Sequence, residues 1–517
     1  MNQRKIGILI SYINIFLHAV LGFIYVPILL YYVGTSEYGI YQLIGSFIAY
    51  FGVMDFGLTA SIIRFYSKYR VLKDNINMEN ILAISMRLYM FITVILIIMG
   101  SGVYIFFDKI FLYSMTQSEI YLAKRIMILL IINVVINMMT MIFRAIINAY
   151  EKFLILKGLE TVQLILQPLF VILILQEYPS AFSVALVQTI LNSILAIVRI
   201  YYCFVVLNVK IKYHYYDKKL FSDFGKLSLS VFLVTLIDQV FFKTNQIILG
   251  AIEGAVAVAV YSIAAIIYTN YMQMSNAISG VYLPHITGLV IKNNQGKEIS
   301  NLFINIGRWQ YFLLAAIGSG FFIFGEDFIN LWAGMGFEDA YWITLLIIVP
   351  FTIDLIQNIG LAILQAQNKY DFRAKVYFCM GIFNLCLAIP LAKKYGGIGC
   401  AFATGLSMFI GNGLIMNWYY LKITKLEIGR FWKNIGKITI GVVIITIIGY
   451  IFNGLIEDKN IVVFVIKLLI YTLLYIAIMY KFFMNIEEKS KIKNTRLKLE
   501  PRIFHLHKIF YSARTNE

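Results

Sequence analysis

A few charged side chains lie inside stretches of the chain that are otherwise apolar. The basic ones are Arg87, Arg199, Lys243, Arg308 and Lys467, and the acidic ones are Asp55, Asp238 and Asp354. A charge inside an apolar segment is costly, and it normally faces a partner or a water-filled cavity. These residue types indicate two kinds of chemistry: the cations bind an anion, and a carboxylic acid takes up H⁺ or Na⁺.

Lys243 is the strongest candidate for lining such a cavity, because it lies too deep in its apolar stretch to reach the interface easily. Asp238 precedes it in the same stretch, and the two either pair or line the cavity from one helix. For Arg87 and Arg308 two interpretations stay open: contact with a ligand, or a stem that follows the helix and carries the head to the interface. Lys467 is expected to reach the interface in this second way.

The acidic side chains and one histidine are candidates for ion coupling. Asp354 is in the middle of its stretch beside Gln357 and Asn358, and burial favours the protonated form of a carboxylic acid. Asp55 either couples ions or bonds backbone donors freed by the nearby glycines. His18 is a candidate titrating partner, although a lone histidine in an apolar helix more often bonds a neighbouring helix.

Uncharged polar residues gather in two further stretches. They are Gln239, Asn245 and Gln246 in one, and Tyr268, Asn270, Tyr271, Gln273, Asn276 and Ser279 in the next. Such groups either hydrogen-bond the hydroxyls of a sugar or join helices to one another.

The elements that position these residues are membrane-spanning helices. Hydrophobic residues make up 60% of the 517 and charged residues only 14%, which no soluble domain of this size shows. A span needs about 20 apolar residues. Fourteen are predicted, near 10–33, 40–62, 83–106, 125–146, 154–175, 181–206, 227–250, 256–282, 303–325, 341–364, 374–392, 397–420, 435–453 and 461–482. The first is too long and too polar for a signal peptide.

The net charge is +17, and the distribution of the basic residues indicates membrane topology rather than nucleic-acid binding. Most Lys and Arg, including Lys68, Lys73 and Lys218, fall in alternate connections between spans, whereas Glu338 and Asp339 lie in the other set. Because basic segments stay in the cytoplasm, both termini are predicted to be cytoplasmic. The basic tail at 485–517 can then touch anionic headgroups.

The second half of the chain repeats the first at an offset of about 218 residues. Residues 145–153 resemble 362–370, Gly100–Gly102 resembles Gly318–Gly320, and Arg87 corresponds to Arg308. Six spans per copy predict two parallel six-helix bundles, at 1–207 and 208–425, related by an axis along the membrane normal. An extra helix pair follows at 426–484.

No pattern of catalytic residues accompanies the spans. The longest outer connections, 107–124 and 326–340, are short, and the chain has no Asp-x-Asp pair, phosphate-binding glycine loop or zinc-protease motif. The four cysteines have no metal-ligand spacing. We therefore expect a carrier with no cofactor rather than an enzyme.

Several short motifs, in order, resemble the Wzx-type polysaccharide and O-antigen flippases of the multidrug/oligosaccharidyl-lipid/polysaccharide exporter superfamily. They are Pro27–Gly34, Glu37–Tyr41, Asp55–Leu58, Arg64–Tyr66, Asn245–Gly250, Val260–Ser262 and Gln365–Lys369. The resemblance covers nearly the whole chain. It implies two six-helix bundles, an added helix pair, and alternating access.

The resemblance also implies a cargo, an undecaprenyl-pyrophosphate-linked oligosaccharide moved from the cytoplasmic to the outer leaflet of a bacterial plasma membrane for capsule or O-antigen synthesis. A cationic cleft for its head is expected at Lys243, Arg87, Arg308, Arg64 and Arg199. Besides membrane lipids and H⁺ or Na⁺, a polysaccharide polymerase is a candidate partner. The alternatives are a lipid II flippase, a cation-coupled multidrug exporter and, least favoured, a membrane glycosyltransferase or polymerase.

Overall fold

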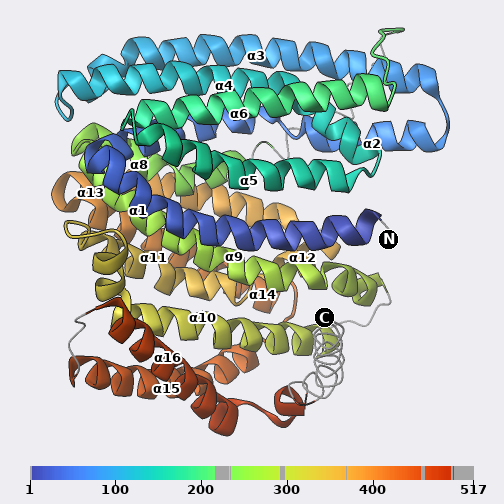
Figure 1. Cartoon of the computed structure of the whole chain (residues 1–517). Helices are drawn as coiled ribbons and strands as arrows, with labels where there is room; N and C mark the ends of the chain where they lie inside the picture. The colour runs from blue at the N-terminus through green and yellow to red at the C-terminus, as the bar shows by residue number, and fades with distance from the viewer. Residues whose placement is uncertain are drawn as a thin grey trace, which may run out of the picture. The chain divides into compact units, whose positions relative to one another are not determined.

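The computed structural model describes residues 3–215, 232, 235–291, 297–367, 369–455, 460–490 and 493. All regular secondary structure in these ranges is helical (Figure 1). The predicted basic positions Lys218 and Lys219, and the first part of the predicted span 227–250, lie outside them.

The helices of the first half are long and closely follow the predicted spans. They are α1 (Gln3–Gly52), the 3₁₀ turn η1 (Val53–Asp55), α2 (Leu58–Val71), α3 (Asn75–Phe111), α4 (Gln117–Ala149), α5 (Phe153–Leu175), α6 (Ala181–Tyr201) and the π-helical η2 (Tyr202–Val206). A helix rises 1.5 Å per residue, so the 37 residues of α3 make it longer than the hydrocarbon core, which is about 30 Å thick. These helices therefore continue beyond the apolar layer.

The second half continues the all-helical pattern. Its elements are α8 (Thr244–Ile252), α9 (Ala255–Ile291), α10 (Lys297–Trp332), α11 (Asp339–Leu355), α12 (Ile359–Ala366), α13 (Tyr370–Met408), η3 (Phe409–Ile415), α14 (Met416–Lys422), α15 (Ile428–Leu455), α16 (Ile461–Ile478) and η4 (Met479–Phe483). Residues 235–242 are also helical.

Ten stretches of the described residues are long and apolar enough to cross a membrane, or eleven if α11 and α12 count as one bent span. Two of the ten, Phe16–Val71 and Asp371–Lys422, have 56 and 52 residues. Each is broken at a glycine with positive φ, Gly34 at 76° and Gly396 at 56°, a conformation that glycine adopts without strain. The chain is thus an all-α, multi-pass membrane protein.

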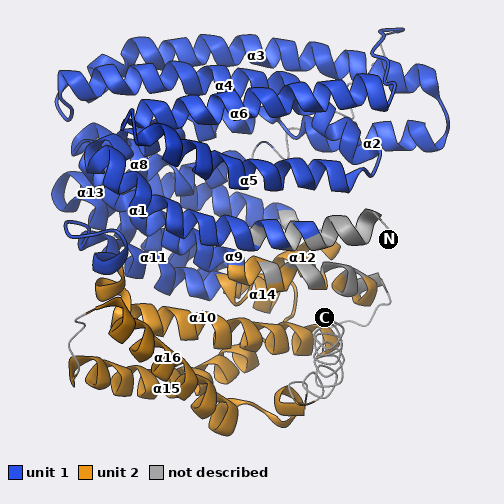
Figure 2. Ribbon diagram, in the orientation of Figure 1, with its two compact units in different colours: residues 1–273, 329–354, 368–416 blue, residues 274–328, 355–367, 417–517 orange. Residues whose placement is uncertain are grey.

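The described helices form two compact units (Figure 2). Unit 1 contains residues 1–273, 329–354 and 368–416, and unit 2 contains 274–328, 355–367 and 417–517. These units are not the predicted repeats, since unit 1 includes all of the first predicted bundle and part of the second. The repeat boundaries at 207 and 425 stay predictions.

In unit 1, α4 packs along both α3 and α6, and α1 packs along α5 (Figure 1). One hydrophobic core of this unit lies between α2, α3 and α4 and includes Tyr66, Tyr89 and Phe143. In unit 2, α15 packs against α16, and Phe324 and Tyr471 belong to the core.

Two predicted spans are interrupted where the sequence indicated continuous helices. The span at 40–62 is broken by η1 and by Phe56 and Gly57, both with positive φ. The span at 341–364 is broken between α11 and α12, with a bend of 42°. Breaks of this kind expose backbone groups at membrane depth, and they are tolerated where the protein itself supplies partners.

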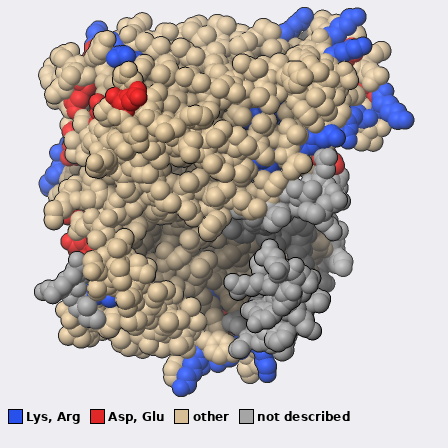
Figure 3. All heavy atoms as spheres, in the orientation of Figure 1, with Lys and Arg blue, Asp and Glu red and all other residues tan. Residues whose placement is uncertain are grey.

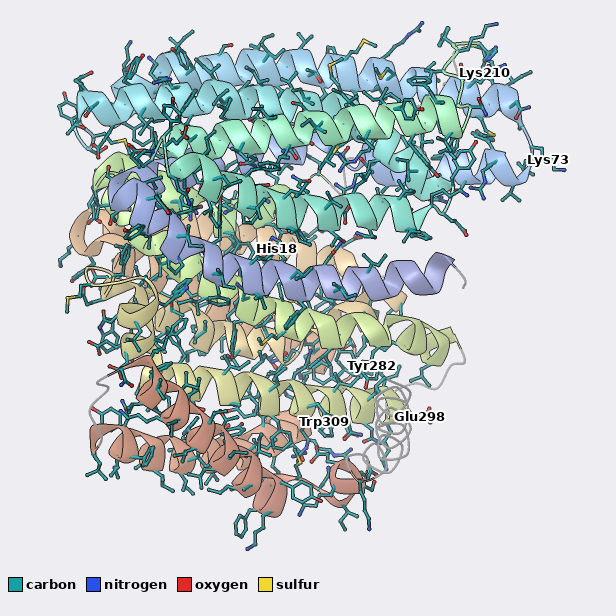
Figure 4. The ribbon with its side chains drawn as sticks, in the orientation of Figure 1. His18, Lys73, Lys210, Tyr282, Glu298 and Trp309 are labelled. Atoms are coloured by element: carbon teal, nitrogen blue, oxygen red, sulfur yellow. The ribbon has the colours of Figure 1, made fainter. Side chains whose placement is uncertain are left out.

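Basic side chains gather at one end of the helices of unit 1, and acidic ones are more frequent at the other (Figure 3). Lys73 and Lys210 lie together at the basic end (Figure 4). Both belong to connections that the charge pattern predicts to be cytoplasmic.

At the start of α9, the chain passes very close to α1. A Cβ atom at Gly39 would overlap the carbonyl oxygen of Ala255, whereas a Cβ atom at Gly45, on the same helix, would meet nothing within 4 Å. Glycine is therefore required at position 39 and not at position 45.

We expect Gly39→Ala to lower the free energy of unfolding by about 1–3 kcal/mol, the usual cost of overpacking. Gly45→Ala is the matched control, and it should be neutral or stabilising by up to about 1 kcal/mol because alanine favours helix. Thermal unfolding of the detergent-purified proteins measures both. Equal melting temperatures for the two variants would contradict the close contact.

Candidate functional site

Lys243 lies in unit 1 at the junction between helical residues 235–242 and α8. Its side chain is half-buried, and no hydrogen bond or ion pair joins its ammonium to any residue that the structure describes. The expected pairing with Asp238 is not formed. A helix N-terminus carries partial positive charge, so the ammonium and the start of α8 together favour an anion.

Asp238 belongs instead to a polar cluster with residues of α11 and α13. Its carboxylate accepts a hydrogen bond from the Tyr377 hydroxyl at 3.1 Å, while Asp354 pairs with Arg373 at 3.4 Å. Phe241 stacks on the Tyr377 ring, with 5.0 Å between centroids. Two carboxylates therefore lie near one arginine, an arrangement able to take up a further cation. Arg373 and Tyr377 were not predicted, since Arg373 was counted among the charges at the end of a span.

Asn245 and Gln246 are fully buried and join neighbouring helices. Asn245 donates to the hydroxyls of Tyr261 and Thr404, both at 2.8 Å, and Gln246 bonds Ser262 and Ser46. Their burial favours the interhelical interpretation over cleft lining. Gln239 is half-buried, and its side chain has no hydrogen bond to the described residues.

The polar residues of α9 divide into buried and exposed ones. Tyr268 is buried, and the Tyr271 hydroxyl bonds Thr352 at 2.5 Å. Asn270 donates to its own helix at the carbonyl of Ile266. Gln273 and Asn276 are exposed, and Asn276 accepts a hydrogen bond from Asn358 at 2.7 Å. Only the exposed residues of this set are accessible to a sugar in this structure.

Asp55 and His18 have different surroundings. The Asp55 carboxylate accepts hydrogen bonds from the hydroxyls of Tyr89 at 2.7 Å and Thr59 at 2.9 Å. Side chains thus replace the backbone donors expected there, and they hold the broken segment at 53–57 in place. His18 is exposed on α1 (Figure 4), with no hydrogen bond to the described residues.

The other predicted cations of unit 1, Arg64, Arg87 and Arg199, lie near its basic end. Arg64 is exposed, and Arg87 is exposed with its guanidinium over the Tyr213 ring, 3.9 Å from the centroid. Arg199 is only 8% exposed, and its Nε has no hydrogen-bond partner among the described residues. Its neighbours Arg144 and Glu160 were not singled out from the sequence.

Arg308 has a structural role in unit 2. It is 4% exposed and holds the carboxylate of Glu488 through two hydrogen bonds, at 2.6 and 2.9 Å. It also donates to the carbonyl of Phe483 at 3.0 Å. The beginning of the predicted tail at 485–517 is therefore folded against α10. This pair was not predicted, because its members are 180 positions apart in the sequence.

Lys467 does not extend to the interface as predicted. It is 1% exposed, and its ammonium donates to the side-chain oxygen of Asn453 at 2.9 Å. Asn453 in turn contacts Asp327 at 3.4 Å. The amide oxygen of Asn453 on α15, whose amide nitrogen bonds Asp327 on α10, is the hydrogen-bond partner of this buried cation.

Unit 2 also contains an apolar cavity of about 720 Å³ between α10 and α16. Its walls include Trp309, Phe321, Leu468 and Ile476 (Trp309 is labelled in Figure 4). The hydroxyls of Tyr471 and Tyr475 bond Ser319 and the carbonyl of Phe312, so these polar tips are already satisfied. The cavity suits a hydrocarbon chain.

No group of three His, Cys, Asp or Glu residues within the described ranges is close enough together to hold a metal ion. Cys203 and Cys400 are buried, and Cys379 and Cys386 are exposed.

The buried pair of Arg308 and Glu488 yields a stability test. Glu488→Gln should lower the free energy of unfolding by about 3–5 kcal/mol, because it leaves a buried guanidinium without its anion. The matched control is Glu427→Gln, which breaks the exposed pair with Arg430 in the same unit and should cost at most about 1 kcal/mol. Thermal unfolding measures both, and equal losses would contradict the structural role of Arg308.

Comparison with known families and curated proteins gives a consistent result. A sequence model described as "Polysaccharide biosynthesis protein" matches residues 5–290. A protein from Shigella flexneri named for O-antigen transport is 22% identical over 430 residues, which cover 79% of this chain and 96% of the relative. A protein from Haloferax volcanii named as the low-salt glycan biosynthesis flippase Agl15 is 22% identical over 247 residues, covering 48% of this chain and 52% of the relative.

Solved structures share the fold. The lipid II flippase MurJ in an inward closed conformation aligns with a TM-score of 0.71 at 18% identity, over 92% of this chain and 99% of that one. An inward-facing multidrug transporter of the MATE family, from the MOP superfamily, aligns with a TM-score of 0.59 at 13% identity, over 80% and 96%. The chain thus shares the fold of these two proteins.

The matched region, residues 5–290, is more than half of the 517 residues. It contains α1 to α6, α8 and nearly all of α9, and so it includes Lys243 and Arg199. The resemblance inferred from the short motifs is confirmed, and the chain belongs to the polysaccharide biosynthesis protein family.

Proposed function

We propose that this chain is a flippase that moves an undecaprenyl-pyrophosphate-linked oligosaccharide from the cytoplasmic to the outer leaflet of a bacterial plasma membrane, by alternating access. The product would serve the assembly of a capsule or O-antigen. Such a cargo has a charged, hydrated head that cannot cross about 30 Å of hydrocarbon unaided, and a lipid tail that never needs to leave it.

The observation that carries this proposal is Lys243. A lysine at membrane depth normally has a partner, yet this one has none among the described residues, and it precedes the N-terminus of α8. Fixed cations at a helix start suit a pyrophosphate, because charge-assisted hydrogen bonds offset its loss of hydration. The exposed amide of Gln273, in the same unit, would contact sugar hydroxyls.

The apolar cavity of unit 2 supports the lipid part of the cargo. It lies between α10 and α16, a helix of the added pair, and its volume of about 720 Å³ accommodates several isoprene units. The tail would remain in an apolar setting while the head moves.

The finer architecture is part of the same proposal. Breaks at Gly34 and Gly396 divide two long stretches, and a further span is expected at 227–250, which favours fourteen spans. The proposed architecture is two six-helix bundles with an added helix pair. Both termini are proposed to lie in the cytoplasm, because basic side chains gather at one end of unit 1 (Figure 3). Asp354 and Asp238, close to a single arginine, are the proposed site for a coupling H⁺ or Na⁺.

Deletion of the gene should stop surface polysaccharide display while completed lipid-linked repeat units accumulate in the cytoplasmic leaflet. Extraction and mass spectrometry of the lipid-linked glycans, with and without a membrane-impermeant enzyme that modifies outward-facing units, measures this. Units that stop before completion would indicate a synthetic enzyme instead. Accumulation of lipid II alone would assign the chain to peptidoglycan precursor transport.

Lys243→Ala should reduce surface display by about 10-fold or more, since a hydrogen bond to a charged group contributes about 1.5–3 kcal/mol. Lys243→Arg should retain part of the activity because the charge persists. Display is measured at matched protein level.

Lys109→Ala is the control, because this exposed lysine lies near the end of α3, away from the proposed cleft. Removing Lys243 leaves no described anion without its partner, so the variant should melt at the wild-type temperature. Normal display from a well-expressed Lys243→Ala would exclude this lysine as an essential ligand.

A further inference from the structure

Three cations from three packed helices meet around a single carboxylate near the basic end of unit 1. Arg144 of α4 and Lys157 of α5 both bond Glu160 of α5, the lysine at 2.8 Å. Arg199 of α6 lies close enough to interact with the charges of both Arg144 and Glu160. The helices α4, α5 and α6 contact one another in pairs, so the cluster has a rigid frame.

The charges of this cluster do not balance. Arg144, Lys157 and Arg199 supply three positive charges, and Glu160 supplies one negative charge. Arg144 is five residues before the end of α4, about 8 Å inside the helix end. An excess of positive charge at that depth is costly unless an anion joins it.

Arg199 is the member without a hydrogen bond. Its side chain is more than nine-tenths buried, its Nε has no partner, and no ion pair within 4 Å ties it to the described residues. An arginine in the last turn of a helix often bonds the final carbonyl groups, but Arg199 makes no such bond in the described structure. Its buried donors are therefore available to a ligand.

The cluster is also accessible. The Arg144 side chain is 44% exposed and that of Lys157 is 30% exposed, so a ligand can reach these two cations, and the buried Arg199 lies near them. Asn14 of α1 bonds the carbonyl of Lys157 and accepts a hydrogen bond from Thr161, which fixes the position of α5. The packing of α4, α5 and α6 thus holds the three cations near one another.

We propose that Arg144, Lys157 and Arg199 bind the phosphate group of a membrane lipid, and that Glu160 keeps two of these cations in position until the phosphate arrives. The surplus of two positive charges matches a pyrophosphate better than a single phosphate. This inference rests on the proposed function for the identity of the cargo, whose pyrophosphate would meet this cluster on the cytoplasmic side before it reaches Lys243. Arginine suits the task, because its planar fork binds two phosphate oxygens at once.

The test measures lipid binding to the purified, full-length protein in detergent. Undecaprenyl pyrophosphate and phosphatidylglycerol are the two probes, and native mass spectrometry and the lipid-induced rise in melting temperature are the two readouts. Arg199→Gln should weaken binding of undecaprenyl pyrophosphate by about 10- to 100-fold, and Arg199→Lys should retain part of it. Added salt should weaken binding to the wild-type protein.

Two further variants separate binding from folding. Arg125→Gln alters an exposed arginine of α4 at its opposite end and should bind as the wild type does. Glu160→Gln raises the surplus of positive charge, so it should bind undecaprenyl pyrophosphate more tightly even if its unliganded form melts earlier. A variant that only misfolds would not gain affinity.

The two lipids distinguish the source of the phosphate. If binding of undecaprenyl pyrophosphate depends on Arg199, the cluster is a cargo site. If only binding of phosphatidylglycerol depends on Arg199, the cluster is a site for bilayer headgroups. The proposal is overturned if Arg199→Gln and Arg125→Gln bind both lipids equally well. That result would leave the flippase proposal intact, because the latter is tested separately by the units that accumulate after gene deletion.

Discussion

The cost of leaving a charge or a backbone polar group without a partner in hydrocarbon is the constraint on which this structure depends. It explains why all the described secondary structure is helical, since a helix satisfies its own backbone. It also explains why breaks in the helices have local partners. Asp55, for example, ends η1 and is held by two hydroxyls from α2 and α3.

The same constraint separates the buried cations into two groups. Arg308 and Lys467 have partners within unit 2, a carboxylate and an amide oxygen, and they stabilise the packing of α10, α15 and α16. Lys243 and Arg199 have no such partners among the described residues. Cations of the first group hold helices together, whereas those of the second are available to an anionic cargo. Residue type and depth alone do not make this distinction.

Hydropathy depends only on neighbouring residues, so the sequence predicted the all-helical, multi-pass fold and the bounds of several individual spans. The span predicted at 154–175 corresponds to α5 at Phe153–Leu175, and α15 includes all of the predicted 435–453. The breaks near Asp55 and between α11 and α12 were not predicted, since they depend on contacts with distant helices.

The candidate site was predicted less well, for the same reason. Lys243 and Arg199 were identified from their depth in apolar stretches. Arg144 and Glu488 were not, because each lies close to the end of a helix, where charges usually face water. Only the fold brings Glu488 to Arg308 and Arg144 to Glu160. Long-range pairing of this kind leaves no periodic signal in a single sequence.

The position of Glu488 has a practical consequence for protein engineering. It lies after the last spanning helix, in a segment that would ordinarily be removed or replaced by a purification tag or fluorescent reporter. A chain shortened at residue 484 would retain every helix from α1 to α16 yet lose the only carboxylate bonded to Arg308 in the described structure. Tags and truncations should therefore begin beyond the short helical segment at 486–490, which functions as part of the membrane domain.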